Sequence, residues 1–253
     1  ELAVLLIHQA FSPIRNSQFY SQLKEYNRVL EQRVEERTIA LQSAHQELQQ
    51  IHFRMTSELE EAAILQRSMI PDKLPKIKGL EWSNCFQVAT ETGGDWFNFY
   101  YTDDQLVIVI GDVTGHGMSA ALLVASVHTT WLQLLKMLKY SPDLELSPSF
   151  ILDQLNYAVY KLGRQKYLMT FFVARINLKT GELIFANAGH NLPLMIRSNE
   201  PISYLLNNGL RLGDHKENDY KEKRTFLKKG DVLCFYTDGV IENTNPEDEE
   251  YGG

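Results

Sequence analysis

The chain has 253 residues, 44% of them hydrophobic, which is enough for a sizeable packed core. Its net charge of -7 and the lack of any basic patch in the sequence exclude nucleic acid as an expected partner. The two cysteines, Cys85 and Cys234, lie far apart and outside any metal-binding spacing, which argues against a disulfide framework and favours the reducing cytoplasm.

The N-terminal segment at residues 1–19 begins with an apolar run at residues 2–7, much shorter than the roughly 20 residues of a membrane span. This run suits either the last turns of a membrane segment or the start of a helical linker, and both interpretations stay open. The chain starts at Glu1 rather than Met, and residues 251–253 lead into no closing element. We therefore expect a fragment that is cut at both ends.

Residues 20–70 have the sequence of one long helix, free of proline and glycine and rich in Glu, Gln, Leu, Arg and Ala. An apolar heptad seam runs along it, with Tyr20, Val34, Leu41, Leu48, Met55, Ala62 and Met69 at a positions and Leu23, Leu30, Ala44, Ile51 and Leu65 at d positions. Arg37 and Glu58 interrupt the d positions, whereas Asn27 at an a position favours parallel pairing of two helices. We predict a parallel homodimer through residues 20–69; a single amphipathic helix folded onto its own domain is the alternative.

Pro71 ends this helix, and the pattern then changes to short strands, so residues 71–253 are predicted to form a separate domain. Strands are expected at residues 81–88, 96–101, 105–110, 169–177, 182–187, 192–197 and 232–236. Helices are expected at residues 119–138 and after Ser147, which can cap a helix that has Pro148 in its first turn. Helices in the middle of a strand-rich chain predict an α+β layered architecture.

Three aspartates stand at the ends of predicted strands beside glycine or other small residues: Asp95 in Gly93-Gly94-Asp95, Asp112 in the loop at residues 111–117, and Asp238 in Tyr236-Thr237-Asp238-Gly239. A single aspartate in such a place usually forms a turn. Three in one domain favour a hard-oxygen site for magnesium or manganese, because without a cation the carboxylates would repel one another.

The loop at residues 111–117 (Gly-Asp-Val-Thr-Gly-His-Gly) would bring a carboxylate, a hydroxyl and an imidazole to one place. A phosphate-binding loop is the competing interpretation, but the sequence lacks both the Lys-Ser/Thr of a Walker motif and the spacing of the dinucleotide fingerprint. His116 is a candidate catalytic residue together with Asp112; a role in packing or in the turn is the alternative for His116.

Four motifs in this order resemble those of the SpoIIE/RsbU-type phosphatases, the bacterial branch of the PPM family: Gly93-Gly94-Asp95, residues 111–117, Asn187-Ala188-Gly189-His190-Asn191 and residues 236–239. The match runs from about residue 62 to the end, and the preceding helix resembles the linker between sensor and phosphatase in such proteins. The resemblance implies a PPM-type α-β-β-α sandwich of two antiparallel sheets flanked by helices, with two Mn²⁺ or Mg²⁺ ions at one end.

By resemblance, Asp112 bridges both ions, the Val113 carbonyl is a backbone ligand, and Asp95 and Asp238 are further ligands. The implied reaction is hydrolysis of phosphoserine or phosphothreonine on a regulatory protein, a STAS-type anti-sigma antagonist, by metal-activated water in bacterial signal transduction. The resemblance further implies a signalling role for the helix before Pro71. It also implies a sensor upstream of Glu1 that would tether the domain to the inner face of the membrane.

The sequence departs from the family pattern at its end, where the family has one more metal-binding aspartate before a closing strand. Residues 248–250 are acidic but lead into no apolar strand, so they are not expected to replace it. The chemistry of the motif at residues 187–191 does not follow from its residue types. His190 either orients a ligand or holds a turn, and the structural role is favoured.

Two other functions compete with the phosphatase. A weak or inactive phosphatase-like scaffold that signals through its coiled coil is opposed by the retention of all three aspartates. A nucleotide cyclase is suggested by Gly93-Gly94-Asp95, but it would need an acidic residue where Trp96 stands. Neither cysteine has the cationic neighbours of a thiolate nucleophile, and Cys234, inside an apolar strand, is expected in the core.

Overall fold

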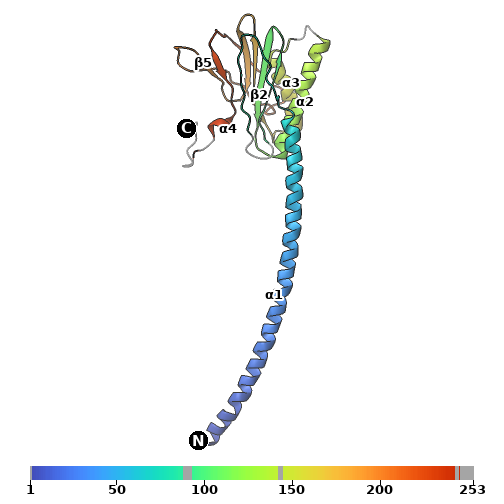
Figure 1. Cartoon of the computed structure of the whole chain (residues 1–253), viewed down its shortest axis with the longest axis vertical. Helices are drawn as coiled ribbons and strands as arrows, with labels where there is room; N and C mark the ends of the chain where they lie inside the picture. The colour runs from blue at the N-terminus through green and yellow to red at the C-terminus, as the bar shows by residue number, and fades with distance from the viewer. Residues whose placement is uncertain (1, 88–92, 142–144, 243–244, 246–253) are drawn as a thin grey trace. The chain divides into compact units, whose positions relative to one another are not determined.

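The computed structural model describes residues 2–87, 93–141, 145–242 and 245, with side chains from Asn16 onward. The chain divides into two compact units, residues 1–58 and residues 59–253. Helix α1 (Leu2–Arg67) spans the first unit and enters the second (Figure 1). The expected domain boundary near Pro71 stays a prediction, because the division between the units falls inside the helix.

Helix α1 begins at Leu2, well before Tyr20. It therefore includes most of residues 1–19, for which the sequence allowed either the end of a membrane segment or the start of a helical linker. The large apolar side chains of the heptad seam are exposed to solvent along residues 20–55, including Tyr20, Leu23, Leu30, Val34, Leu41, Leu48, Ile51 and Met55. A helix with so long an exposed apolar stripe is typical of a coiled-coil partner.

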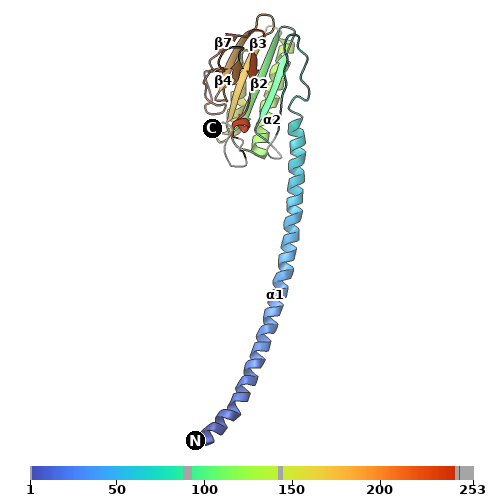
Figure 2. The same cartoon turned by 60° about the vertical axis from the view of Figure 1, so that its left-hand side comes forward.

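The second unit is built on two antiparallel sheets, as the family resemblance implied (Figure 2). The larger sheet has the order β1-β2-β3-β4-β7, with β1 (Trp96–Tyr101), β2 (Gln105–Val113), β3 (Met169–Asn177), β4 (Glu182–Ala188) and β7 (Lys223–Phe226). The smaller sheet has the order β6-β5-β8, with β5 (Leu194–Ile196), β6 (Ser203–Tyr204) and β8 (Val232–Cys234).

Two helices, α2 (Met118–Tyr140) and α3 (Pro148–Gly163), pack on one face of the larger sheet. The Ser147 hydroxyl accepts a hydrogen bond from the Phe150 N–H, and Pro148 occupies the first turn of α3, as expected. Among the described residues, α2 alone is long and apolar enough to suit a membrane span. Here α2 is a core helix whose Val124, Val127 and Trp131 are buried against the sheet.

The opposite face of the larger sheet packs on the smaller sheet through a second apolar cluster that contains Leu106, Phe172, Ala174, Phe185, Met195 and Leu205. The rings of Phe172 and Phe185 stack with their centroids 5.7 Å apart. A short helix, α4 (Asp238–Ile241), follows β8. The layers are therefore helices, large sheet and small sheet, and loops from both sheets meet at one end.

Two expectations about local structure were wrong. Residues 81–87 form no strand, because Trp82 is held in a loop by a hydrogen bond from its Nε1 to the Pro75 carbonyl oxygen (2.8 Å) and by an edge contact with Phe99. Residue 88 lies outside the described part of the chain. Cys234 is exposed rather than buried, because alternate residues of β8 face away from the core.

A buried asparagine fixes the loop that closes the helical side of the unit. The Asn156 amide donates to the carbonyl oxygens of His215 (3.1 Å) and Lys216 (3.2 Å), and its side-chain oxygen accepts from the Gly213 N–H (2.9 Å). Asn156 is 1% exposed, so water cannot replace these bonds.

Replacing Asn156 with alanine removes these bonds and leaves the buried Gly213 N–H without an acceptor. We expect the free energy of unfolding to fall by about 2–4 kcal/mol. Urea unfolding would show this as a lower midpoint at an unchanged slope. Asp153→Ala, at an exposed position of the same helix, is the matched control and should change stability by about 0.5 kcal/mol or less. Equal losses in the two variants would contradict the prediction.

Candidate metal centre

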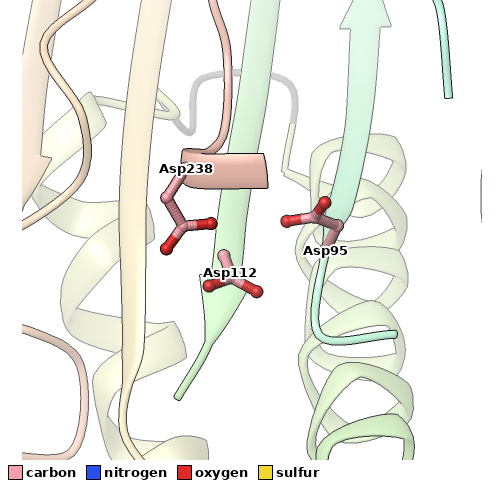
Figure 3. Close-up of side chains that lie close together, drawn as sticks. All are labelled: Asp95, Asp112 and Asp238. Atoms are coloured by element: carbon pink, nitrogen blue, oxygen red, sulfur yellow. The ribbon is translucent and has the colours of Figure 1, made fainter. Parts of the chain in front are cut away.

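Three carboxylates from separate elements meet at one end of the two sheets. Asp95 immediately precedes β1, Asp112 is the penultimate residue of β2, and Asp238 begins α4 after β8. One oxygen of each lies within 4.8 Å of the others (Figure 3). Antiparallel pairing of Trp96 with Gly111 brings the first two together, whereas Asp238 belongs to the segment that follows β8 of the smaller sheet.

Gly94 lets the backbone approach this group closely. A Cβ atom at Gly94 would lie 2.6 Å from Asp112 Oδ1 and 2.7 Å from the Val113 carbonyl oxygen, which are distances that real Cβ atoms do not reach. The Val113 N–H also donates to the Gly94 carbonyl oxygen (3.2 Å). The Val113 carbonyl oxygen and the Asp112 carboxylate therefore line the same small space, and glycine keeps that space open.

The two oxygens of Asp95 have different surroundings. Oδ2 accepts a hydrogen bond from the hydroxyl of Thr237 (3.1 Å), which is the residue before Asp238. Oδ1 is buried and has no hydrogen-bond partner among the described residues. A buried carboxylate oxygen is costly without a partner, so this atom is available to bind a cation.

Burial and neighbouring negative charge raise the pKa values of the Asp95 and Asp112 carboxyl groups. Burial, followed by the charges of Asp95 and Asp238, raises the pKa of Asp112 from 3.8 to about 8. Burial also raises the pKa of Asp95, and the Thr237 hydroxyl partly opposes that shift. Without a cation, Asp112 therefore keeps its proton near neutral pH.

The other groups of the loop at residues 111–117 do not join the carboxylates. His116 is exposed and outside the three-carboxylate group, so its predicted catalytic role rests on the sequence alone. The Thr114 hydroxyl accepts from the Leu168 N–H (3.0 Å) and donates to the Leu168 carbonyl oxygen (3.1 Å). Thr114 therefore anchors the loop to the start of β3.

The motif at residues 187–191 forms a buried turn. The Asn187 side chain accepts from the His190 N–H (2.7 Å) and donates to the carbonyl oxygens of His190 (3.0 Å) and Asn207 (2.9 Å). These contacts support the structural role that the sequence favoured for this motif. Burial lowers the pKa of His190 to about 4, so its ring is neutral at physiological pH.

Sequence reasoning missed several residues that support the carboxylates. The Gln66 side chain donates to the Gly93 carbonyl oxygen (2.6 Å) and accepts from the Gly93 N–H (3.1 Å), two residues before Asp95. The Met69 carbonyl oxygen accepts from Trp96 Nε1 (3.2 Å). These contacts join the end of α1 to the Asp95 segment. The only sign of them in the sequence was Gln66, a single polar residue near the end of the helix.

The donor set suits a hard divalent cation. Carboxylate and carbonyl oxygens are the ligands preferred by Mg²⁺ and Mn²⁺, and the unpartnered Asp95 oxygen and the space beside Gly94 face the same group. The acidic residues 248–250 lie outside the described residues.

Comparisons with known proteins agree on one family. Residues 102–253 match the family described as Stage II sporulation protein E (SpoIIE). The phosphoserine phosphatase RsbU of Bacillus subtilis is 30% identical over 203 residues, which are 78% of this chain and 57% of RsbU. The chain thus spans little more than half the length of this relative.

Solved structures give the same answer for the fold. The SiaA-PP2C domain of Pseudomonas aeruginosa has a TM-score of 0.66 at 19% identity, over 80% of this chain and 79% of that domain. The structure of the RsbU and RsbW domains of a Mycobacterium tuberculosis protein has a TM-score of 0.51 at 30% identity, over 62% of this chain and 42% of that one. The expected PPM-type sandwich is therefore confirmed.

The raised pKa of Asp112 predicts how the metal-free protein responds to pH. A carboxyl whose pKa is higher in the folded than in the unfolded state stabilises the fold fully below about pH 4, and this contribution is lost as pH rises to about 8. With EDTA present, the Tm of the wild type should therefore fall over this range.

Asp112→Asn cannot ionise and should abolish most of that fall, whereas the exposed control Asp103→Asn should leave it in place. Adding Mn²⁺ at about pH 8 should raise the Tm of the wild type but not of Asp112→Asn. Thermal melts measure both effects. An Asp112→Asn curve that follows the wild type across the range would show the pKa assignment to be wrong.

Proposed function

The chain belongs to the SpoIIE family, and on that premise we propose that it is a metal-dependent phosphatase of phosphoserine and phosphothreonine in proteins. The observation that carries the proposal is the group formed by Asp95, Asp112 and Asp238, in which one oxygen of each residue lies within 4.8 Å of the others. Carboxylates so close repel one another strongly unless a cation or a proton intervenes.

In the proposed site, Asp95, Asp112, Asp238 and the Val113 carbonyl would hold two Mn²⁺ or Mg²⁺ ions. Such ions supply a water molecule made acidic enough to attack phosphorus and positive charge that offsets the charge of the phosphoryl oxygens. The chain contributes the geometry: Gly94 admits the Val113 carbonyl, and Thr237 orients the Asp95 carboxylate. Asp112 must release its proton for this purpose, which the positive charge favours.

The proposed substrate is a phosphorylated regulatory protein of the STAS type. Support comes from the relative named phosphoserine phosphatase RsbU and from a relative that carries an RsbU domain together with an RsbW domain. We place the chain in the cytoplasm, at the inner face of the membrane if a membrane sensor precedes it. Its two free, exposed cysteines suit a reducing compartment.

A second copy of the chain is the proposed partner of α1. The apolar side chains at the a and d positions of residues 20–55 are exposed, and within the described chain nothing covers them. A parallel coiled coil would bury this stripe, with Asn27 paired across the axis. The contacts of Gln66 with Gly93 would then connect the paired helices to the Asp95 segment.

The same exposed stripe favours one competing function, a dimeric scaffold without catalysis. A cyclase receives no support, because Trp96, which stands where a cyclase needs an acidic residue, is 1% exposed and packs in the core.

Mn²⁺-dependent hydrolysis tests the phosphatase directly. We expect the protein to release phosphate from a phosphoserine protein and from p-nitrophenyl phosphate, and Asp112→Asn to lower kcat/KM by about 100-fold or more, because it removes charge from the metal site. Asp103→Asn is the control and should retain activity. An inert wild type that still dimerises would favour the scaffold, and products formed from GTP would favour a cyclase.

Sedimentation equilibrium tests the coiled coil. Leu41→Glu with Leu48→Glu places charges at two a positions and should weaken dimerisation by about 100-fold or more, since each buried leucine contributes about 1.5–3 kcal/mol. Gln42→Glu with Gln49→Glu adds the same charges at outward b positions and should leave the dimer intact. Equal effects of the two pairs would rule out the heptad seam as the interface.

A further inference from the structure

The turn between α3 and β3, at residues 164–167, has a strained backbone. Arg164 ends α3 with φ 49° and ψ 37°, and Gln165 follows with φ 59°. They are two of the three non-glycine residues with positive φ in the described part of the chain. Glycine is the usual residue in this left-handed conformation at a helix end, because other side chains adopt it at a cost. The side chains of this turn therefore require an explanation.

Internal contacts account for Gln165 but not for its neighbours. Gln165 Nε2 donates to the Asp214 carbonyl oxygen (3.1 Å), which ties the turn to the loop that contains Asp214. The Arg164 side chain is exposed and makes no hydrogen bond or ion pair with the described residues. Lys166 is also exposed, and its amine lies 5.1 Å from the centre of the Tyr167 ring. The turn thus exposes two cations that have no carboxylate partner among the residues that the structure describes.

The turn lies at the same end of the larger sheet as the three carboxylates. Asp112 pairs with Thr170 across β2 and β3. Two residues further on, the Thr114 N–H donates to the Leu168 carbonyl oxygen (2.8 Å), and Lys166 is two residues before Leu168. At about 3.4 Å per residue, the chain from Thr170 to Lys166 spans at most about 14 Å. A peptide with its phosphoserine at the carboxylates can therefore reach the turn with residues about three or four places away.

The charge of the turn is opposite to that of the whole chain. The net charge of -7 repels an acidic protein from most of the surface, whereas unpaired cations beside the carboxylates attract it locally. Arginine and lysine bind carboxylates and phosphates through charge-assisted hydrogen bonds. Backbone strain at Arg164, whose side chain has no internal contact, points to a contact with another molecule.

We propose that Arg164 and Lys166 form a substrate-recognition site that binds acidic side chains close to the phosphoserine of the protein substrate. The substrate class is then phosphoserine in an acidic surround, and the strained turn presents the two cations to it. This inference deepens the proposed phosphatase function and rests on it.

Two synthetic phosphoserine peptides test the proposal. One has glutamate at the third to fifth positions on both sides of the phosphoserine, and the other has glutamine there. With Mn²⁺ at low salt, the wild type should hydrolyse the glutamate peptide with a kcat/KM about 3–10-fold higher. About 0.5 M NaCl should remove most of this preference, because exposed charges are screened. p-Nitrophenyl phosphate has no flanking residues and measures the metal site alone.

Three variants separate recognition from folding and from net charge. Lys166→Glu should reverse the preference between the peptides. Arg164→Gly should remove most of it at an unchanged or higher Tm, because glycine accepts the left-handed conformation without strain. Lys229→Glu is the matched control: Lys229 is exposed and follows Leu227, whose N–H donates to the Gly181 carbonyl oxygen at the opposite end of the larger sheet. This variant should keep the wild-type preference.

A wild type that hydrolyses p-nitrophenyl phosphate but treats the two peptides equally, or hydrolyses neither, would overturn the proposal. Equal losses of preference in Lys166→Glu and Lys229→Glu would also overturn it, because net charge alone would then set the preference. A wild type that is inert toward p-nitrophenyl phosphate as well would overturn the phosphatase itself. That failure is distinct from hydrolysis without a preference for the acidic peptide.

Discussion

Electrostatic repulsion among three carboxylates is the constraint on which the second unit depends. At an effective dielectric constant of about 20, two ionised carboxylates about 4 Å apart would repel by roughly 4 kcal/mol. One oxygen each of Asp95, Asp112 and Asp238 lies within 4.8 Å of the others, and Asp112 therefore stays protonated near neutral pH unless a cation binds. The backbone holds them there. Strand β2 is paired on both edges, and Asp112 cannot move away without breaking its pairing with β3. Trp96, which is 1% exposed, anchors the chain next to Asp95.

The supports of the three carboxylates are unequal. Asp95 and Asp112 belong to neighbouring strands of a five-stranded sheet that packs against two helices. Asp238 follows a strand of three residues in a three-stranded sheet. The direct tie between the two groups is the bond from Thr237 to Asp95 (3.1 Å), and further from the carboxylates the Phe172 and Phe185 cluster joins the sheets. The two sheets can therefore respond differently when one of the three aspartates is replaced.

The sequence predicted what is encoded locally. The strands at residues 96–101 and 169–177 have the expected bounds, because their apolar residues lie on buried faces. The carboxylates were recognisable from glycine at strand ends. The contacts of Gln66, Thr170 and Thr237 join residues 27, 58 and 142 positions apart, and no local pattern reports such pairs. The strand predicted at residues 81–87 was wrong because the local apolar pattern gives no sign of the hydrogen bond between Trp82 and the Pro75 carbonyl oxygen.

The thinness of the smaller sheet has a thermodynamic consequence for the whole domain. Its strands, at residues 194–196, 203–204 and 232–234, offer few ladder hydrogen bonds, so this part should open at a lower free energy than the five-stranded sheet. A cation that binds all three aspartates binds only the state in which the smaller sheet is folded, and by mass action it therefore stabilises that state. A higher concentration of divalent cation would thus suppress local unfolding of the smaller sheet. The amide hydrogens of residues 232–234 would then exchange more slowly with solvent.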